Sequence, residues 1–455
     1  MIVVNRQVVI VGCGLAGTTA AEAARKQDRS ASITIVERTG HHEYSRCGLP
    51  YVISGHVQPP SNLFLNKKAY YEGSLKANLL LEASLEKINP VDRTVIIRRL
   101  DGLEVLGYDS LVLATGAQPV DLPIPGFGKA GVMKLRTLED AISISSTVKR
   151  DGRAVIIGAG LIGLEVADAL NGRGNHVTVV EMMPEVLPTV FDHTMAARVR
   201  EALVSKGVTF MLGKKVDSIV GFDRAEAVVV EGEVVKADLV VASAGIRPRT
   251  EEARAAGVSV GRYCGIVVGE GSQTNVPSIF AAGDCVELAN RLVSESRPIQ
   301  LATVALRTGE VAGANAAGGQ ERLPDLFGNT SSSLASVEVS STGLSETEAK
   351  KHGIPTLVAE GSSYAYAPYY PGGGDLVTKL IVDSRSGLLV GAQFLGPGAA
   401  GWGNLVTMII AQGLHITALA YLETNFSPPV QNFWPSPVVA ARRLNRLFVS
   451  RRVSV

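Results

Sequence analysis

Cys47 is the residue of this sequence whose surroundings point most directly to chemistry. It lies in the run Tyr-Ser-Arg-Cys-Gly-Leu-Pro-Tyr at residues 44–51, where Pro50 suits the first turn of a helix. A helix N-terminus stabilises a thiolate, and the adjacent Arg46 adds to this effect if its side chain turns inward. Because the thiolate is the reactive form, we predict a redox role for Cys47. The alternative is a small buried packing residue, the commonest role of a cysteine outside a disulfide.

A single sulfur is available at this place in the chain, because the four cysteines of the sequence are widely separated. The oxidised form of Cys47 would be a mixed disulfide with a small thiol, a persulfide or a sulfenic acid. We interpret the other cysteines, Cys13, Cys264 and Cys285, as packing or turn residues. The seven histidines lack cysteine or acidic partners at ligand spacing, so we predict no metal site.

A glycine-rich fingerprint follows the first strand-like run of the chain. Residues 8–11 have the apolar character of a buried parallel strand, and Gly-Cys-Gly-Leu-Ala-Gly occupies residues 12–17. A helix to about residue 26 and a second strand at 33–36 follow, and this strand ends on an acid that can bind a ribose hydroxyl. The glycines allow a tight turn, close approach of a pyrophosphate and helix packing. The predicted nucleotide contacts are Gly12, Gly14, Leu15, Ala16, Gly17 and Glu37.

The same pattern recurs between residues 154 and 181, with a strand, a glycine-rich turn, a helix through residue 170 and a second strand. The predicted contacts are Gly158, Gly160, Leu161, Ile162, Gly163 and Glu181. Glu181 would repel the 2′-phosphate of NADPH, which favours NADH unless a nearby arginine overrides it. Two fingerprints imply two dinucleotides, and the economical pair is a tightly held FAD and a nicotinamide that reduces it.

Two weaker motifs, at residues 114–117 and 279–284, each place a small-residue turn after a strand. With both fingerprints, they make the chain resemble the FAD-dependent pyridine nucleotide-disulfide oxidoreductases over essentially its whole length. The resemblance implies that the first fingerprint holds FAD and the second NAD(P)H. It also implies that Asp284 contacts the ribityl chain of FAD and that Glu165 orients the nicotinamide. Further implied cofactor contacts are Arg38, Arg46, Ala114, Thr115, Gly116, Gly245, Gly283 and Ala302.

The resemblance also implies an architecture. The expected class is α/β, with two Rossmann-like dinucleotide-binding domains and a C-terminal α+β dimerisation domain that pairs two subunits in a homodimer. Alternating strands near residues 377–382 and 388–392, followed by helical patterns at 405–412 and 416–422, are compatible with the last of these. The expected segments are 1–117 and 248–325 for FAD, 118–247 for NAD(P)H, and 326–455 for the dimerisation domain.

The Cys-Gly-Leu-Pro-Tyr run resembles the single-cysteine branch of this family, which includes coenzyme A disulfide reductases, persulfide and sulfur reductases, and NADH oxidases and peroxidases. The predicted function is transfer of hydride equivalents from NAD(P)H through FAD to Cys47, with reduction of a small disulfide, persulfide or polysulfide. Coenzyme A is a candidate thiol. One alternative is an NADH oxidase or peroxidase that reduces O2 or H2O2 through a Cys47 sulfenic acid. Another is an electron-transfer reductase of a partner protein such as rubredoxin.

Aromatic residues near the C-terminus separate this chain from its relatives. Single-cysteine reductases have a Tyr-Ala-Pro-Pro segment whose tyrosine reaches the partner's active site, whereas this chain has Phe426, which has no hydroxyl to donate. A Tyr-Tyr-Pro-Gly turn is preserved, so the resemblance implies catalytic contacts for Tyr369 and Tyr370. A surface turn packed by aromatics is an equally good interpretation of that turn. Phe433 and Trp434 could line an apolar pocket at the dimer interface, but we interpret them as packing residues, the commoner role of aromatics near a proline-rich end.

The charge balance excludes several classes of partner. The chain has 44 basic and 43 acidic residues, so no overall field attracts nucleic acid or a membrane surface. No apolar run reaches the length that spans a bilayer, and the N-terminus lacks the pattern of a signal peptide. We therefore expect a cytoplasmic protein without nucleic-acid or membrane partners. We interpret the arginine-rich C-terminal tail as an ordinary surface helix.

Overall fold

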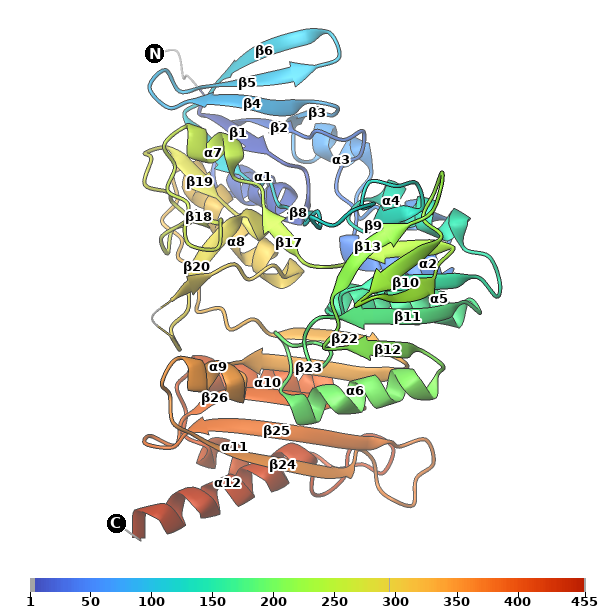
Figure 1. Ribbon diagram of the computed structural model, residues 1–455. Helices are drawn as coiled ribbons and strands as arrows, with labels where there is room; N and C mark the ends of the chain where they lie inside the picture. The colour runs from blue at the N-terminus through green and yellow to red at the C-terminus, as the bar shows by residue number, and fades with distance from the viewer. Residues whose placement is uncertain (1–4, 294, 454–455) are drawn as a thin grey trace. The chain divides into compact units, whose positions relative to one another are not determined.

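The computed structural model describes residues 5–293 and 295–453, and the chain forms two compact units. The first unit contains the residues up to Val120 with Arg136–Ile142 and Gly245–Asp325. The second contains Asp121–Leu135, Ser143–Ala244 and the residues from Leu326 onward. Each unit has a five-stranded parallel sheet, and the predicted α/β class is confirmed (Figure 1). The domain boundaries at residues 117, 247 and 325 remain our proposal.

The first unit is built on a parallel sheet with the strand order β19-β7-β1-β2-β3. Its strands are β1 (Gln7–Val11), β2 (Ser32–Val36), β3 (Ala77–Leu80), β7 (Ser110–Leu113) and β19 (Ile279–Ala281). The helix α1 (Leu15–Gln27) connects β1 to β2. The predicted strands and helix around the first fingerprint are confirmed to within one residue at most boundaries. All four residues at 8–11 are buried, which explains the unbroken apolar run.

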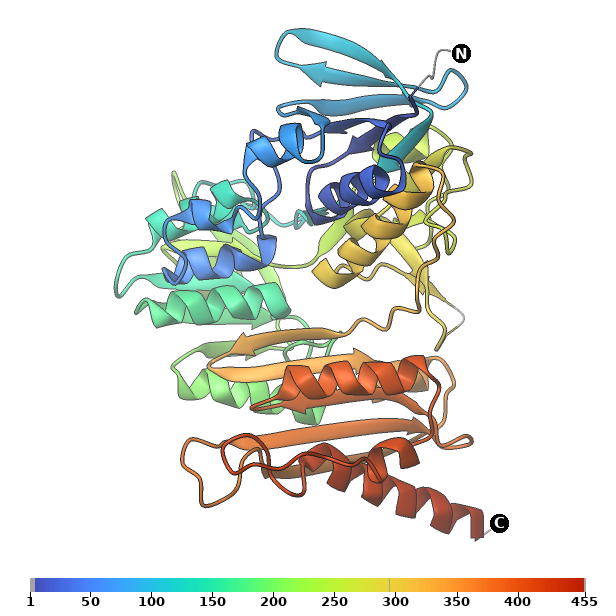
Figure 2. The same cartoon turned by 180° about the vertical axis from the view of Figure 1, so that it is seen from behind.

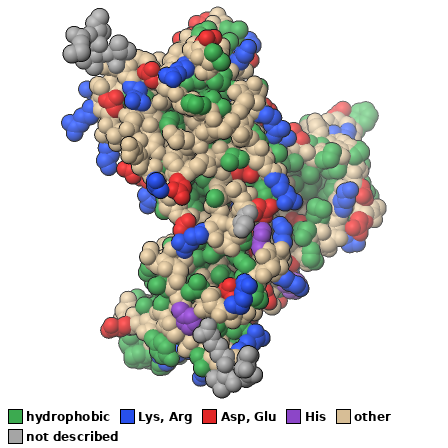
Figure 3. All heavy atoms as spheres, turned by 90° about the vertical axis from the view of Figure 1, so that its left-hand side faces the viewer, with side chains coloured by type: hydrophobic (Ala, Val, Ile, Leu, Met, Phe, Trp, Pro, Cys, Tyr) green, Lys and Arg blue, Asp and Glu red, His purple; other side chains and the backbone are tan. Residues whose placement is uncertain are grey.

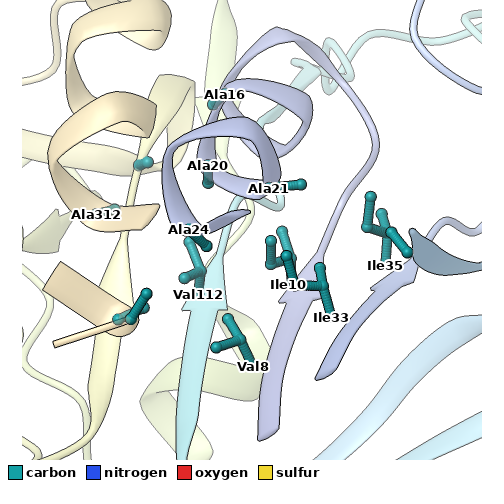
Figure 4. Packing of buried hydrophobic residues seen from close by; sticks show 14 of the residues in the cluster. Val8, Ile10, Ala16, Ala20, Ala21, Ala24, Ile33, Ile35, Val112 and Ala312 are labelled. Carbon is teal, nitrogen blue, oxygen red and sulfur yellow. The ribbon is translucent and has the colours of Figure 1, made fainter. Parts of the chain in front are cut away.

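Small residues let α1 lie close to this sheet and to the helix α8 (Ala302–Ala316). Figure 4 shows the alanines of α1 directed toward Val8, Ile10 and Val112 on one side and toward Ala312 of α8 on the other. A Cβ placed on Gly313 of α8 would lie only 2.0 Å from the carbonyl oxygen of Ala20. The two helices therefore touch backbone to backbone beneath the first glycine-rich turn.

Smaller elements complete the first unit. Three antiparallel strands, β4 to β6, form one sheet, β8 pairs with β17, and β18, β20 and β21 form another sheet. The strands are β4 (Ser84–Asn89), β5 (Thr94–Arg99), β6 (Gly102–Gly107), β8 (Ala117–Pro119), β17 (Ile246–Pro248), β18 (Ile266–Val267), β20 (Val286–Ala289) and β21 (Ser296–Arg297). The helices are α2 (Leu49–Ser54), α3 (Lys68–Gly73) and α7 (Glu251–Ala255), and α4 (Leu138–Thr147) belongs partly to each unit.

The second unit repeats the parallel arrangement with the strand order β12-β11-β10-β16-β9. Its strands are β9 (Val132–Lys134), β10 (Arg153–Ile157), β11 (His176–Glu181), β12 (Thr209–Leu212) and β16 (Leu239–Ala242). A small antiparallel sheet follows, with β13 (Val216–Val220), β14 (Ala227–Val230) and β15 (Glu233–Lys236). The helices are α5 (Leu161–Gly172) and α6 (His193–Ser205). The predicted second fingerprint thus has the strand-turn-helix context that it requires.

The C-terminal part of this unit is an antiparallel sheet with the order β22-β23-β26-β25-β24. Its strands are β22 (Thr330–Leu334), β23 (Val337–Gly343), β24 (Thr356–Tyr364), β25 (Asp375–Asp383) and β26 (Leu389–Leu395). The helices are α9 (Glu346–Lys351), α10 (Ala399–Ala411), α11 (Thr417–Ala420) and α12 (Ser436–Val453). Figure 2 shows α10 and α12 on one face of the sheet, and α6 lies against the other face. The helix α10 begins six residues before the predicted position, and Ala399, Trp402 and Gly403 of this added part are buried.

A buried ion pair joins α6 to this antiparallel sheet. The Lys379 ammonium lies 3.3 Å from the carboxylate of Asp192, which precedes α6, and 2.9 Å from that of Glu346. The side chains of Lys379 and Asp192 are only 5% and 6% exposed. Asp192 also accepts hydrogen bonds from the backbone N–H groups of Glu346 and Thr347 and from Gln393. The nucleotide-binding fold and the antiparallel sheet of this unit therefore share a charged core.

Charged side chains of both signs are interspersed on the face seen in Figure 3. This distribution agrees with a net charge of +1. None of the helices within the described residues combines the length and the apolar character needed to cross a membrane.

Candidate active site

Cys47 is solvent-exposed, so the interpretation of a buried packing residue does not fit. It lies in the 3₁₀ turn Arg46–Gly48, which leads directly into α2 with Pro50 in the first turn. The next residue, Gly48, is buried, and a Cβ there would lie 2.2 Å from the Cδ2 atom of Leu63. A larger residue after the cysteine would therefore have to displace the end of the Leu63 side chain.

Arg46 connects the cysteine turn to the first glycine-rich turn of the same unit. Its Nη1 atom lies 2.8 Å from the position that a Cβ on Gly14 would take. The guanidinium carbon also lies 5.2 Å from the ring centroid of Tyr44, a cation–π distance. The guanidinium is thus held over the backbone at which a pyrophosphate would approach.

The first glycine-rich turn has the shape that a dinucleotide needs. Gly12 has a φ of +108°, and a Cβ there would lie 2.2 Å from the carbonyl oxygen of Ala114. A Cβ on Gly17 would lie 1.8 Å from the carbonyl oxygen of Gly12. Leu15 and Ala16 open α1, whose N-terminal N–H groups form an anion-binding end. The segment at Ala114 is therefore brought against the turn by β7, the neighbour of β1.

The second turn has the same construction. Gly158 has a φ of +105°, and a Cβ there would lie 2.5 Å from the carbonyl oxygen of Ser243. A Cβ on Gly163 would lie 2.1 Å from the carbonyl oxygen of Gly158, whereas one on Gly160 would meet no atom within 4 Å. Leu161 and Ile162 form the first turn of α5. The open space at Gly160 fits a site in which a ligand covers the middle glycine.

Both terminal acids are oriented by the glycine-rich turns themselves. Glu37 accepts a hydrogen bond of 2.9 Å from the backbone N–H of Cys13, and Glu181 accepts one of 2.7 Å from that of Ala159. The second oxygen of Glu181 accepts a bond of 2.8 Å from the N–H of Met183. A carboxylate has about four acceptor positions. Glu37 also accepts from the N–H and the hydroxyl of Thr39, so it has less capacity left for ribose hydroxyls than Glu181.

Replacing Glu181 tests the predicted preference for NADH. In Glu181→Gln the like charge that would repel a 2′-phosphate is removed, and we expect the ratio of kcat/KM for NADPH to that for NADH to rise about tenfold, equivalent to about 1.4 kcal/mol. The amide also has one acceptor fewer toward the glycine-rich turn, so kcat/KM should fall somewhat for both nucleotides. The quantity to measure is therefore the ratio of the two kcat/KM values. The exposed Glu233→Gln is the control, and an unchanged ratio in Glu181→Gln would remove the electrostatic explanation.

Sequence reasoning missed two arginines of the first unit, Arg136 beside Asp284 and Arg249 near Arg136. The Nη2 atom of Arg136 is 2.8 Å from the Asp284 carboxylate, and both side chains are mostly buried. Burial lowers the pKa of Arg249 to about 10, with repulsion from Arg38 and Arg136 adding to the effect. Glu251 and Glu252 offset this effect only in part, so the group of Arg38, Arg136 and Arg249 is suited to an anionic ligand such as a diphosphate.

The weaker motifs build this cluster. The Thr115 hydroxyl donates to the carbonyl oxygen of Arg249, and a Cβ on Gly116 would lie 3.6 Å from the Nη2 atom of Arg136. Of the remaining predicted contacts, Gly283 has a φ of +80° and lies against Ala16. Gly245 has a φ of +102°, and Ala302 is the first residue of α8. Thr137 and Asp140 form a reciprocal capping box, a local pattern that predicts the start of α4 directly after Arg136 but not the role of Arg136.

Glu165, in the first turns of α5, is held by the antiparallel sheet of its unit. Its Oε1 atom accepts a hydrogen bond of 2.6 Å from the Ser332 hydroxyl on β22. Asp168, one turn further along α5, accepts the backbone N–H of Ala335. Burial raises the pKa of Glu165 above its usual value, and the hydrogen bond from Ser332 partly offsets this rise.

Removing the Ser332 hydroxyl tests whether ionised Glu165 supports nicotinamide binding. Hydrogen bonds to charged groups contribute about 1.5–3 kcal/mol, so in Ser332→Ala the pKa of Glu165 rises further. We expect KM for NADH to increase about tenfold near neutral pH and to recover as the pH rises. Ser332→Thr, which keeps the hydroxyl, and the exposed neighbour Ser331→Ala serve as controls. A pH-independent change in Ser332→Ala would show that the residue matters only for folding.

The other residues singled out from the sequence are two tyrosines and the cysteines besides Cys47. Tyr369 and Tyr370 are 75% and 43% exposed in a turn of the second unit, whereas Cys47 belongs to the first unit. Cys13 and Cys285 are buried as expected, and burial raises the pKa of Cys13 to about 11. Within the described residues, no group of three or more histidine, cysteine or acidic side chains could hold a metal ion.

Comparison with known proteins agrees with this construction. The family model for pyridine nucleotide-disulphide oxidoreductases matches residues 6–309, and the model of that family's dimerisation domain matches residues 331–435. The chain is 35% identical over 427 residues to an NADH oxidase of Methanocaldococcus jannaschii, covering 93% of this chain and 95% of the relative. It is 32% identical over 443 residues to a CoA-dependent NAD(P)H sulfur oxidoreductase of Pyrococcus abyssi, covering 97% of this chain and 98% of the relative.

A solved structure gives the same result. The NAD-dependent persulfide reductase from A. fulgidus matches with a TM-score of 0.94 and 34% sequence identity, over 98% of this chain and 84% of that one. Both fingerprints, the architecture and these matches over most of the length agree: the chain belongs to the pyridine nucleotide-disulphide oxidoreductase family and is an oxidoreductase.

Proposed function

We propose that this protein is an NAD(P)H-dependent flavoprotein reductase whose Cys47 reduces a small disulfide, persulfide or polysulfide. The observation that carries the proposal is the exposed Cys47, whose neighbour Arg46 reaches over Gly14 of the first glycine-rich turn. The Pyrococcus abyssi and A. fulgidus relatives, which are named for reducing sulfur and persulfide, support it. Coenzyme A is a candidate thiol, and we place the protein in the cytoplasm, where thiols are kept reduced.

The first unit fits FAD. The glycine-rich turn, the N-terminus of α1 and Arg46 would hold the pyrophosphate, and Glu37 would bind the adenosine ribose. Asp284, held by Arg136, would face the ribityl chain, and the mutual repulsion of Arg38, Arg136 and Arg249 suits an anionic ligand. Bound FAD supplies the means to accept a hydride from NAD(P)H and to release two electrons to sulfur. The second glycine-rich turn and Glu181 would hold the NAD(P)H.

Cys47 performs the sulfur chemistry in this proposal. Its thiolate attacks the substrate disulfide R–S–S–R′, the S–S bond breaks, and R′–S⁻ leaves as Cys47–S–S–R forms. Two electrons that originate from NAD(P)H, together with one proton, then cleave this mixed disulfide to R–SH and the Cys47 thiolate. A persulfide substrate follows the same route and releases sulfide. Exposure of Cys47 permits attack on a substrate in solution, and Phe426 cannot donate the proton because it has no hydroxyl.

We also propose that the protein works as a homodimer. Two loops of the second unit, hydrogen-bonded between Ala367 and Pro428, present exposed aromatic side chains. They are Tyr364, Tyr369, Tyr370, Phe426 and Phe433, of which Phe426 and Phe433 stack with centroids 3.5 Å apart. Exposed apolar patches of this kind are typical of protein interfaces. Sedimentation of Tyr369→Asp and Phe433→Asp should give monomers, while the control Tyr263→Asp in the first unit stays dimeric.

A second candidate function is that of an NADH oxidase, favoured by the 35% identity to the Methanocaldococcus jannaschii enzyme of that name. The rate of NADH oxidation with different electron acceptors distinguishes the reductase from the oxidase. The reductase proposal predicts that NADH oxidation without oxygen is fast with coenzyme A disulfide or polysulfide and slow with no sulfur compound. Mass spectrometry of the purified protein should find a thiol or an extra sulfur on Cys47. Fast NADH consumption in air alone, with unmodified Cys47, would favour the oxidase.

A further inference from the structure

The second unit contains a hollow of about 350 Å³ beside α12, far along the chain from both glycine-rich turns. It is lined by Tyr421, Trp434, Val439, Arg442, Asn445 and Arg446. Pockets that bind small molecules typically have volumes of about 300–1,000 Å³. The sequence-based interpretation of Trp434 as a packing residue is therefore incomplete, because one side of its indole faces this hollow and 52% of the residue is exposed.

Arg442 is fixed within the hollow by three contacts. Its Nε atom donates a hydrogen bond of 2.9 Å to the carbonyl oxygen of Ala420. Its guanidinium carbon lies 4.3 Å from the ring centroid of Trp434 and 5.9 Å from that of Tyr421. The bond to Ala420 uses one of the five N–H donors of a guanidinium, and the two rings hold its plane. Arg442 thus presents a preorganised set of donors.

The charges around the hollow select the ligand. Arg446 follows Arg442 by four residues and lies on the same side of α12. The residues 436–453 include no acidic residue. Two guanidinium groups on a helix without acidic side chains favour a phosphate, which they bind with paired hydrogen bonds.

The aromatic residues that line the hollow favour a particular kind of ligand. The ring of Tyr421 is 69% exposed, and Asn445 offers both a donor and an acceptor at the rim. An exposed aromatic ring beside a phosphate-binding arginine suits a ligand that has a planar base, since such stacking contributes about 1–3 kcal/mol. We infer that this hollow binds a nucleotide diphosphate group, with phosphates on Arg442 and Arg446 and the base on Tyr421. The inference goes beyond the proposed function and needs neither Cys47 nor either glycine-rich turn.

Fluorescence gives a direct test, because the chain has two tryptophans and Trp402 is buried. In a Trp402→Phe background, the emission of the FAD-loaded protein is followed during titration with ADP while saturating NAD⁺ occupies the second glycine-rich turn. Inorganic phosphate and adenosine are titrated separately. We expect a saturable change with ADP and at least tenfold weaker binding of phosphate or adenosine alone. Equilibrium dialysis of the unmodified protein repeats the comparison without the Trp402 substitution.

Variants on one helix provide the matched controls. Arg442→Gln and Arg446→Gln should each weaken ADP binding at least tenfold, whereas Arg443→Gln, which removes the same charge outside the hollow, should leave it unchanged. Equal losses in all three variants would overturn the inference, since they would reflect the general charge of α12. Loss of the dimer in Arg442→Gln or Arg446→Gln would also overturn it, because these residues would then serve subunit contact.

Discussion

Cys47→Ser should reduce NAD(P)H-dependent turnover of a disulfide or polysulfide by at least ~10³-fold, the order of effect seen when a catalytic nucleophile is removed. Serine has nearly the same size and fits the exposed 3₁₀ turn, so the fold should be unaffected. A serine hydroxyl is far less acidic than a thiol and forms no disulfide, so neither half of the sulfur chemistry can proceed. The measurement is anaerobic turnover with each sulfur substrate.

Cys47→Ser also shows which step of the reaction is lost. FAD content and the rate at which NADH bleaches the flavin absorbance should match the unmodified protein, because neither depends on the sulfur of Cys47. Cys264→Ser, in a partly exposed turn of the same unit, is the matched control and should keep full activity. If Cys47→Ser instead retained turnover, the electrons would leave by another route, as in a reductase of a partner protein.

Lys379→Met should lower the free energy of unfolding by about 3 kcal/mol, because removal of one partner leaves a buried charge without compensation. The Asp192 carboxylate is 6% exposed and would lose its nearest cation, although its hydrogen bonds from backbone N–H groups remain. Methionine fills a similar volume, so the change reports charge rather than a cavity. Urea unfolding followed by tryptophan fluorescence and circular dichroism measures it.

An exposed pair gives the control for this loss. Lys214 forms an ion pair with Glu231 at 2.6 Å in the same unit, but both side chains are nearly half exposed. Exposed ion pairs contribute about 0–1 kcal/mol, so Lys214→Met should change the unfolding free energy little. Similar losses in Lys379→Met and Lys214→Met would refute a special role for the buried pair.

The contribution of the pair should also depend on pH. Burial raises the pKa of Asp192, but the N–H groups of Glu346 and Thr347 and the charge of Lys379 outweigh burial and hold it below the usual value. A carboxyl with a lowered pKa stabilises the fold above its unfolded pKa of 3.8 and loses that contribution as the pH falls through the folded pKa. The difference between the unmodified protein and Lys379→Met should therefore be present at neutral pH and shrink in strong acid.

Much of the nucleotide-binding architecture could be predicted from the sequence alone. Each fingerprint is a local pattern of about 30 contiguous residues, in which glycines, apolar runs and a final acid have to follow one another. The strand that ends just before Glu37 and the one that ends on Glu181 are accordingly where they were expected. The same holds for the turn at Cys47, since Pro50 determines the start of a helix locally.

What the sequence by itself determined about this protein is the pair of nucleotide folds, and it also places the one cysteine for which we propose a redox role, since both depend on neighbours along the chain. The tertiary structure alone decided which distant groups meet: Arg136 with Asp284, Ser332 with Glu165, and Lys379 with Asp192. The partners in each of these pairs are more than 140 residues apart, and no local pattern encodes their contact. Their geometry depends on how the strands and helices pack, which only the folded chain defines.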